Sequence, residues 1–108
     1  MPGRLGELEQ LVLLALVRLG DDAYGVTVRR EIARCTGRPA SFGTIYATLA
    51  RLEDKGLVDS WLGDPTPLRG GRRKKYFRVR PAGKVALRAY LQALRTMTRG
   101  LAPSWPVP

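Results

Sequence analysis

The amino-acid sequence predicts a mainly α-helical fold that carries one small β-hairpin. Four segments have apolar residues at intervals of three and four positions, which is the spacing of an amphipathic helix. Two shorter segments alternate apolar and polar residues, and a stretch rich in Gly, Pro and cations separates them, as in a hairpin with a long loop. The length of 108 residues suits one domain, and 44% apolar with 26% charged residues is typical of a soluble globular protein.

The first two helices are expected at residues 5–19 and 26–36. Glu7 and Glu9 lie near the positive N-terminal end of the first helix, where acidic side chains are stabilising. Gly37 follows the second helix and suits the left-handed conformation that ends many helices. The sequence therefore predicts two helices of moderate length, joined by a short turn.

The third helix is expected to begin after Ser41, a favourable N-cap, and to end near Lys55, just before Gly56. At about 100° per residue, one side of this helix gathers the apolar residues Phe42, Ile45, Leu49 and Leu52. The opposite side gathers small, hydroxylated and basic residues, namely Thr44, Ala47, Thr48, Arg51 and Lys55. Short side chains permit close approach to a DNA groove, and hydroxyl and guanidinium groups bond base edges or phosphates. Tyr46 borders the apolar side, so packing is its expected role and a phosphate contact is secondary.

The hairpin is expected to pair residues 57–62 with 76–79. Trp61 is expected to anchor the first strand against the core. The connecting loop contains two glycines followed by four consecutive cations, Gly70, Gly71, Arg72, Arg73, Lys74 and Lys75. Such a loop reaches neighbouring phosphates or a minor groove more readily than a rigid element does.

A last helix is expected from Pro81, which suits a first helical position, to residue 101. Its apolar stripe comprises Leu87, Tyr90, Leu91, Leu94, Met97 and Leu101. A chain this short cannot easily cover so long a stripe, which favours pairing with a second copy over packing on its own domain. The expected organisation is a DNA-binding domain at 1–80, a dimerisation helix at 81–101 and an irregular Pro-rich tail at 102–108, which holds Trp105.

The charge distribution indicates a polyanionic partner. Residues 1–64 contain eight basic and nine acidic residues, whereas residues 65–108 contain eleven basic and no acidic residues. The longest apolar run, at 11–17, is far shorter than the ~20 residues that span a bilayer, and Glu7 and Glu9 precede it where a signal peptide is basic. Nucleic acid is therefore favoured over a membrane, and a cytoplasmic location is expected.

Metal and acid–base chemistry are not expected. The sequence has no histidine and a single cysteine, Cys35, so the common metal-ligand clusters and an internal disulfide are excluded. No nucleophile and base are paired in a recognisable motif, so neither an enzyme nor a cofactor is expected. Cys35 is expected to be a small buried residue.

Three helices, a hairpin with a basic loop and a final helix form the order of a winged helix-turn-helix with an added dimerisation helix. The third helix would enter the major groove of double-stranded DNA. Its candidate contact residues are Ser41, Thr44, Tyr46, Ala47, Thr48, Arg51 and Lys55. Two alternatives remain open at this point, a protein that binds RNA or coats nucleic acid without specificity, and a winged-helix adaptor that binds another protein.

Several short motifs lie between residues 13 and 83, and the similarity that they carry covers about residues 5–101. They are LLAL at 13–16, AYG at 23–25, GTIYATLARLE at 43–53, GLV at 56–58, GGRRKKYFRV at 70–79 and PAG at 81–83. In combination they resemble the PadR family of bacterial transcriptional regulators, in its smaller subgroup with one C-terminal helix. The resemblance implies a homodimeric repressor that binds DNA through the third helix and the wing and dimerises through the last helix.

The chain departs from that family pattern at a few positions. Ala47 stands where many members have proline, and Arg80 stands where many have threonine before Pro81. Multidrug-sensing members place a tryptophan within the last helix, whereas this helix offers Tyr90 and Met97. The resemblance therefore implies no drug pocket here, and whether a small-molecule effector exists is left open.

Overall fold

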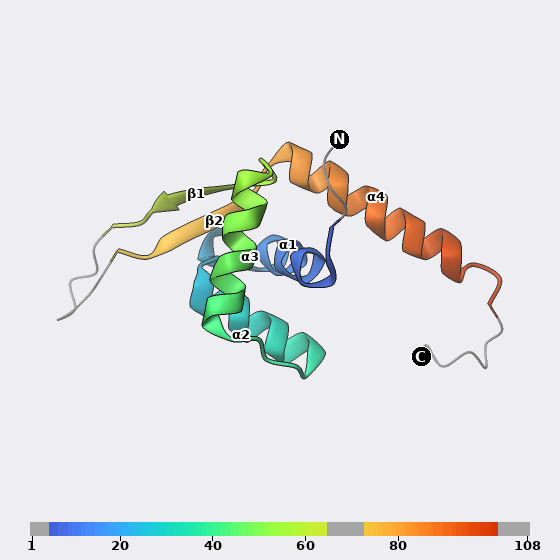
Figure 1. Ribbon diagram of the computed structural model, residues 1–108, viewed down its shortest axis with the longest axis horizontal. Helices are drawn as coiled ribbons and strands as arrows, with labels where there is room; N and C mark the ends of the chain where they lie inside the picture. Colours follow the sequence, from blue (N-terminus) through green and yellow to red (C-terminus); the bar gives the residue numbers. More distant parts are fainter. Residues whose placement is uncertain (1–4, 65–72, 102–108) are drawn as a thin grey trace.

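A computed structural model describes residues 5–64 and 73–101 of the chain and confirms the mainly helical fold with one hairpin (Figure 1). The elements, in order, are α1 (Glu7–Leu19), a 3-10 turn (Gly20–Asp22), α2 (Gly25–Thr36), α3 (Phe42–Asp54), β1 (Val58–Leu62), β2 (Lys75–Val79) and α4 (Pro81–Thr98). Ser41 is the N-cap of α3, and its Oγ accepts a hydrogen bond of 3.1 Å from the backbone N–H of Thr44. Arg80 caps α4 without a side-chain hydrogen bond, as expected where threonine is missing.

The core lies where α1, α2 and α3 meet under the base of the hairpin. Apolar residues of the three helices are fully buried, because each helix turns one apolar stripe inward. The members with no exposed surface include Val12, Leu13, Val28, Ile45, Leu49 and Leu52. Phe77 of β2 and Leu87 of α4 complete this core, so the hairpin and the last helix are both attached to it.

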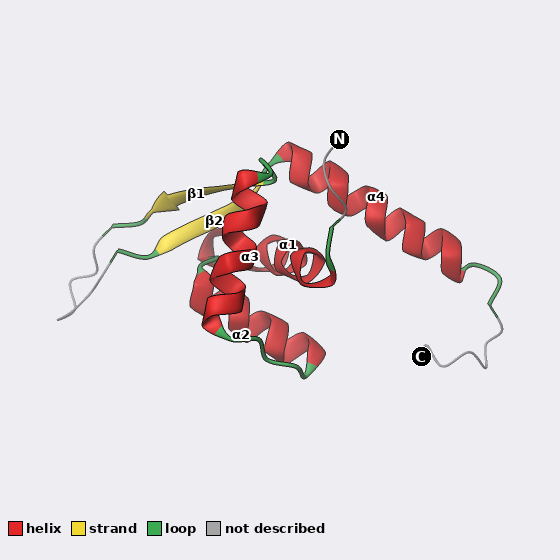
Figure 2. Ribbon diagram, viewed as in Figure 1, coloured by secondary structure: helices red, strands yellow, loops and turns green. Residues whose placement is uncertain are grey.

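The two strands pair antiparallel, with Val58 opposite Val79 and Leu62 opposite Lys75. The segment before α2 joins the other edge of β2. There Tyr24 forms a bridge with Tyr76, and the N–H of Phe77 donates to the carbonyl O of Ala23 over 2.9 Å. One edge of β2 is therefore fixed to the start of α2, while the outer end of the hairpin extends away from the helices (Figure 2).

The last helix is attached through its first turns only. Gly83 packs closely against Leu57, the residue before β1. A Cβ on Gly83 would be 2.3 Å from the carbonyl O of Leu57. Gly83 and Leu87 are the residues of α4 that are buried, and the rest of the helix projects away from the domain (Figure 1). Among the described residues, no helix is long and apolar enough to cross a membrane.

Ion pairs join α1 to α2 on the outer side of the domain. Glu31 of α2 accepts from Arg34 over 2.7 Å and from Arg18 of α1 over 2.5 Å. Hydrogen bonds from Arg34 and then Arg18 lower the pKa of Glu31 to about 2. The carboxylate of Glu31 is therefore ionised in the folded domain at neutral pH.

Three expected burials are wrong. Phe42 is exposed, because it is the first residue of α3 and lies at the edge of the domain. Its ring packs against the guanidinium of Arg29 from α2 instead of entering the core. Trp61 is exposed on the outer face of the hairpin, because Val58 and not Trp61 turns toward the core in β1. Cys35 is exposed near the end of α2, where its Sγ lies 3.4 Å from Nη2 of Arg34.

Candidate nucleic-acid interface

The outer face of α3 presents small and hydroxylated side chains with one arginine. Ser41, Thr44, Ala47 and Arg51 are all exposed there. The hydroxyl groups of Ser41 and Thr44 are 2.8 Å apart at the start of the helix, so the cap also orders the threonine. The surface therefore combines hydrogen-bonding groups with a close-approach position at Ala47.

Thr48 does not belong to that face, which corrects the sequence-based expectation. It is 0% exposed, and its Oγ1 donates to the carbonyl O of Thr44 over 2.8 Å. At about 100° per residue it lies only about 40° from Leu52 on the helix, so the core boundary includes it. The Nη2 of Arg51 donates to Oγ1 of Thr48 over 3.2 Å, so Thr48 holds the exposed arginine in place.

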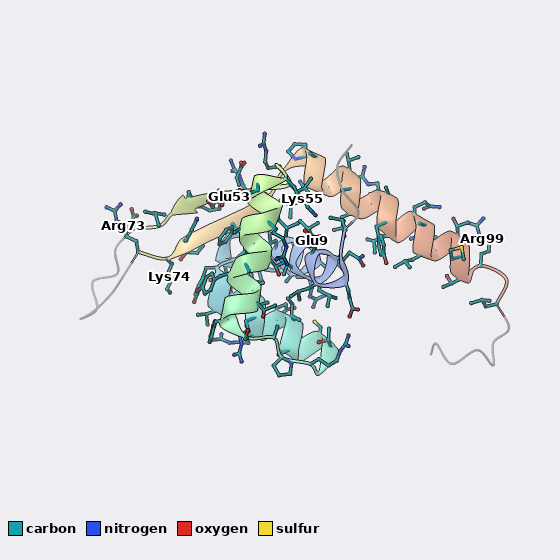
Figure 3. All side chains as sticks on the ribbon, in the orientation of Figure 1. Glu9, Glu53, Lys55, Arg73, Lys74 and Arg99 are labelled. Carbon is teal, nitrogen blue, oxygen red and sulfur yellow. The ribbon has the colours of Figure 1, made fainter. Side chains whose placement is uncertain are left out.

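Lys55 is exposed as a residue, but its ammonium is paired with a carboxylate of α1. Its Nζ donates to Oε2 of Glu9 in α1 over 2.7 Å, and its side chain is 29% exposed (Figure 3). Burial raises the pKa of Glu9, but the hydrogen bonds from Lys55 and from the N–H of Gly6 lower it more, so its pKa lies below the usual value. The sequence does not predict this pairing, because the two partners are 46 residues apart.

Tyr46 lies at the junction of α3 and α2. Its ring is stacked on Phe42, with centroids 6.5 Å apart, and 48% of the residue is exposed. The same ring lies on Gly25, where a Cβ would be 2.5 Å from both Cζ and Oη. Arg29 of α2 donates from Nε to the carbonyl O of Ala40 over 2.6 Å, and its guanidinium covers the ring of Phe42. Arg29 therefore joins α2 to the start of α3, a role that the sequence alone did not predict.

The described cations of the loop lie at the outer end of the hairpin. Arg73, Lys74 and Lys75 are exposed, and Figure 3 shows the first two at the outer end of the hairpin, just before β2 begins and far from α4. The Nζ of Lys74 is 4.6 Å from the ring centre of Tyr24. The predicted residues Gly70, Gly71 and Arg72 lie outside the described part of the chain.

Glu53 links the end of α3 to both strands, a role that the sequence did not disclose. Its Oε2 accepts from Oγ of Ser60 in β1 over 2.6 Å, and its Oε1 is 3.7 Å from Nζ of Lys75 in β2. The buried residues Val58 and Phe77 pack the strands on the helices, and Glu53 adds polar contacts at the edge of this core. The exposed face of α3 and the strands therefore belong to one packed unit.

A row of aromatic rings packs along the outer half of the hairpin. Trp61 and Tyr76 are stacked with centroids 5.8 Å apart, and Tyr76 meets Tyr24 edge to face at 5.5 Å. The guanidinium of Arg78 lies 5.6 Å from the ring centre of Trp61. The exposed tryptophan is thus explained by contacts along the strands rather than by the core.

The apolar stripe of α4 is divided into a buried and an exposed part. Leu87 packs in the core of its own chain, which removes it from the expected dimerisation surface. Tyr90 is half-buried, and the following residues Leu91, Leu94, Met97 and Leu101 are exposed, with Met97 at 76%. A groove of about 550 Å³ runs between α1 and α4, with Leu14, Val17, Leu87 and Leu91 among its lining residues.

Side chains that bind metals are dispersed. Within residues 5–64 and 73–101, no three His, Cys, Asp or Glu side chains gather closely enough to hold a metal ion.

Relatives of known sequence match most of the chain. The transcriptional regulator Rv3488 of Mycobacterium tuberculosis is 34% identical over 79 residues, which are 73% of this chain and 69% of that protein. An uncharacterised protein of Lysinibacillus sphaericus is 34% identical over 91 residues, which are 82% of this chain and 75% of that protein.

Solved structures share the fold, and one sequence family covers most of it. A PadR family transcription regulator from Clostridium difficile R20291 has a TM-score of 0.72 at 28% identity, over 87% of this chain and 93% of that one. A PadR family regulator from Eggerthella lenta has a TM-score of 0.68 at 30% identity, over 87% and 81%. Members of this family are transcriptional regulators and not enzymes. Residues 13–89 match the transcriptional regulator PadR-like family, and the chain belongs to that family.

Proposed function

We propose that the protein is a homodimeric repressor that binds a pseudo-palindromic DNA operator in the cytoplasm. Residues 1–80 would bind DNA and residues 81–101 would dimerise. The observation that carries the proposal is the presence of two surfaces suited to DNA on one packed domain. The exposed face of α3 and the exposed cations at the end of the hairpin extend from a shared core that includes Val58 and Phe77, and Glu53 adds polar contacts between α3 and both strands.

The chemistry of α3 suits the major groove. Ala47 lets the helix approach closely, Thr44 and Ser41 offer hydroxyl groups, and Arg51 bonds a guanine edge or a phosphate. The helix is held from behind, so these groups reach the bases with little loss of conformational freedom. Arg73, Lys74 and the adjoining basic loop would contact neighbouring phosphates or the minor groove.

The uncovered part of α4 supports the dimer. Leu91, Leu94, Met97 and Val17 expose apolar surface along one side of the molecule, as an interface between copies requires. A twofold axis through this surface would place two copies of α3 about one DNA turn, or ~34 Å, apart. Such a dimer on a promoter would exclude polymerase. If a small-molecule effector acts, entry between the paired helices would change the separation of the two copies of α3.

Selection from a random-sequence duplex pool tests the proposal directly. We expect enrichment of a sequence with twofold symmetry, and sedimentation of the free protein as a dimer. If about six phosphates are neutralised, the slope of log affinity against log salt is expected to be about −5. Placed upstream of a reporter gene, the selected sequence should lower transcription when the protein is present.

Two variants separate specific DNA binding from its alternatives. Arg51→Ala should weaken binding to the selected duplex by about tenfold or more, as loss of a base or phosphate contact does. Arg30→Ala removes the same charge from an exposed position on α2 and is the matched control. Equal binding of unrelated duplex or single-stranded RNA would favour a non-specific nucleic-acid protein. Full reporter repression by Arg51→Ala would favour an adaptor.

A further inference from the structure

One buried carboxylate connects the beginning of α1 with the end of α3. Glu9 is 6% exposed, although it lies in the first turn of a surface helix. Its Oε1 accepts from the N–H of Gly6 over 2.8 Å, and its Oε2 accepts from Nζ of Lys55 over 2.7 Å. Lys55 is the C-cap residue of α3, so the contact fixes the end of the helix that carries the DNA-facing groups.

A second ion pair of α1 offers a direct comparison. Glu7 accepts from Nη2 of Arg38 over 2.9 Å, which also joins α1 to the segment that leads into α3. Both of these side chains are highly exposed, at 73% and 74%. Exposed pairs contribute little to geometry or stability, whereas removing one member of a buried pair has a large effect.

This pair, in which Glu9 is buried and the Lys55 side chain is 29% exposed, also determines which cations are available to DNA. Lys55 belongs to the basic side of α3, yet its charge is compensated by a carboxylate at hydrogen-bond distance. An unpaired lysine there would extend toward phosphate on any duplex and strengthen binding without regard to sequence. The pKa of Glu9 lies below its usual value, so the compensating charge is present at neutral pH.

We propose that Glu9 is a positioning residue for DNA discrimination. It fixes the end of α3 on α1 and keeps the Lys55 ammonium from binding phosphates non-specifically. The proposal rests on the proposed DNA-binding function and adds a determinant of specificity that does not touch DNA.

The experiment compares Glu9→Gln with Glu7→Gln in the full chain. Both variants remove one negative charge from the first turn of α1, so their long-range effect on DNA is matched. Glutamine at position 9 retains an acceptor for the N–H of Gly6, so α1 keeps its cap. The probes are the selected duplex and a scrambled duplex of equal composition, and Kd is measured by fluorescence anisotropy over a salt series.

We expect Glu9→Gln to reduce the ratio of affinities for the selected and scrambled duplexes by about tenfold relative to Glu7→Gln. Its salt slope on scrambled duplex should steepen by about one for each released lysine, or about two per dimer. In the double variant Glu9→Gln with Lys55→Gln, which has the wild-type net charge, the slope should return to the wild-type value. Circular dichroism selects a temperature at which all variants are folded.

The outcomes are distinct. If the wild type and Glu7→Gln do not distinguish the two duplexes, the proposed function fails. If they do, but Glu9→Gln discriminates as well as Glu7→Gln, the positioning role of Glu9 is overturned. A lower ratio with an unchanged salt slope would contradict the sequestration of Lys55, since a purely structural defect releases no cation.

Discussion

Replacing Gly25 by alanine isolates the contact that places Tyr46 at the junction of α2 and α3. A Cβ on Gly25 would be 2.5 Å from both Cζ and Oη of Tyr46, whereas unstrained contacts need about 3.5 Å. The ring must therefore retreat by about 1 Å. Gly25 does not have a positive φ, so the alanine backbone itself is unstrained and the effect is confined to this contact.

The expected magnitude follows from two opposed contributions. Overpacking costs about 1–3 kcal/mol, whereas a Gly→Ala change on compatible backbone contributes about 0.4–1 kcal/mol of stabilisation through the unfolded state. We therefore expect Gly25→Ala to lower the free energy of unfolding by about 1–2 kcal/mol. Tyr46→Ala removes a half-exposed ring and should cost about 1–2 kcal/mol by itself.

Urea unfolding at a fixed protein concentration measures both effects and their coupling. The double variant should be more stable than additivity predicts by about 1–2 kcal/mol, because the space left by Tyr46 accommodates the new methyl group. A neutral or stabilising Gly25→Ala would refute the steric argument. Strict additivity in the double variant would refute the assignment of the clash to Tyr46.

Three further contacts can be tested with the same assays. A Cβ on Gly83 would lie 2.3 Å from the backbone carbonyl O of Leu57, so Gly83→Ala should lower the free energy of unfolding by about 2–4 kcal/mol. A loss below about 0.5 kcal/mol would show that α4 can shift to relieve the contact. Thr48→Val removes the hydroxyl that holds Arg51 and should change stability by no more than about 1 kcal/mol while weakening the selected duplex severalfold. An unchanged Kd would show that Arg51 needs no such support. The lowered pKa of Glu31, about 2 against 4.5 unperturbed, gives stability that is present above the unfolded pKa and lost as pH falls. The urea midpoint should therefore fall more steeply with acidification in the wild type than in Glu31→Gln, and equal slopes would contradict this role.

The helices and the hairpin could be predicted because their signals are local. Apolar periodicity located the four helices, and Ser41 and Gly37 marked a beginning and an end that the structure retains. Alternation of apolar and polar residues on either side of a stretch rich in Gly, Pro and cations located the hairpin in the same way. Each signal is contained within a few turns of chain, so no tertiary information was needed.

The candidate site was predicted less well, because a helical wheel does not show what covers each side of the helix. Thr48 lies at the core boundary and is buried, whereas Phe42 lies nominally inward and is exposed at the end of α3. Lys55 faces a carboxylate from a distant helix. These positions depend on how neighbouring elements pack, which periodicity does not contain.

The charge asymmetry of the sequence likewise differs from the charge pattern of the surface. Asp59 of the acidic half lies 3.7 Å from Nε of Arg78 and 3.6 Å from Nε of Arg80, which both belong to the basic half. Glu9 compensates Lys55 in the same manner. Cations near the base of the hairpin are therefore partly compensated, while Arg73 and Lys74 at its outer end have no carboxylate partner within the described residues. Pairing therefore removes part of the attraction for DNA at the base of the hairpin. It leaves that attraction at the outer end of the hairpin and along α4, where Lys84, Arg88, Arg95 and Arg99 are exposed and likewise have no carboxylate partner among the described residues.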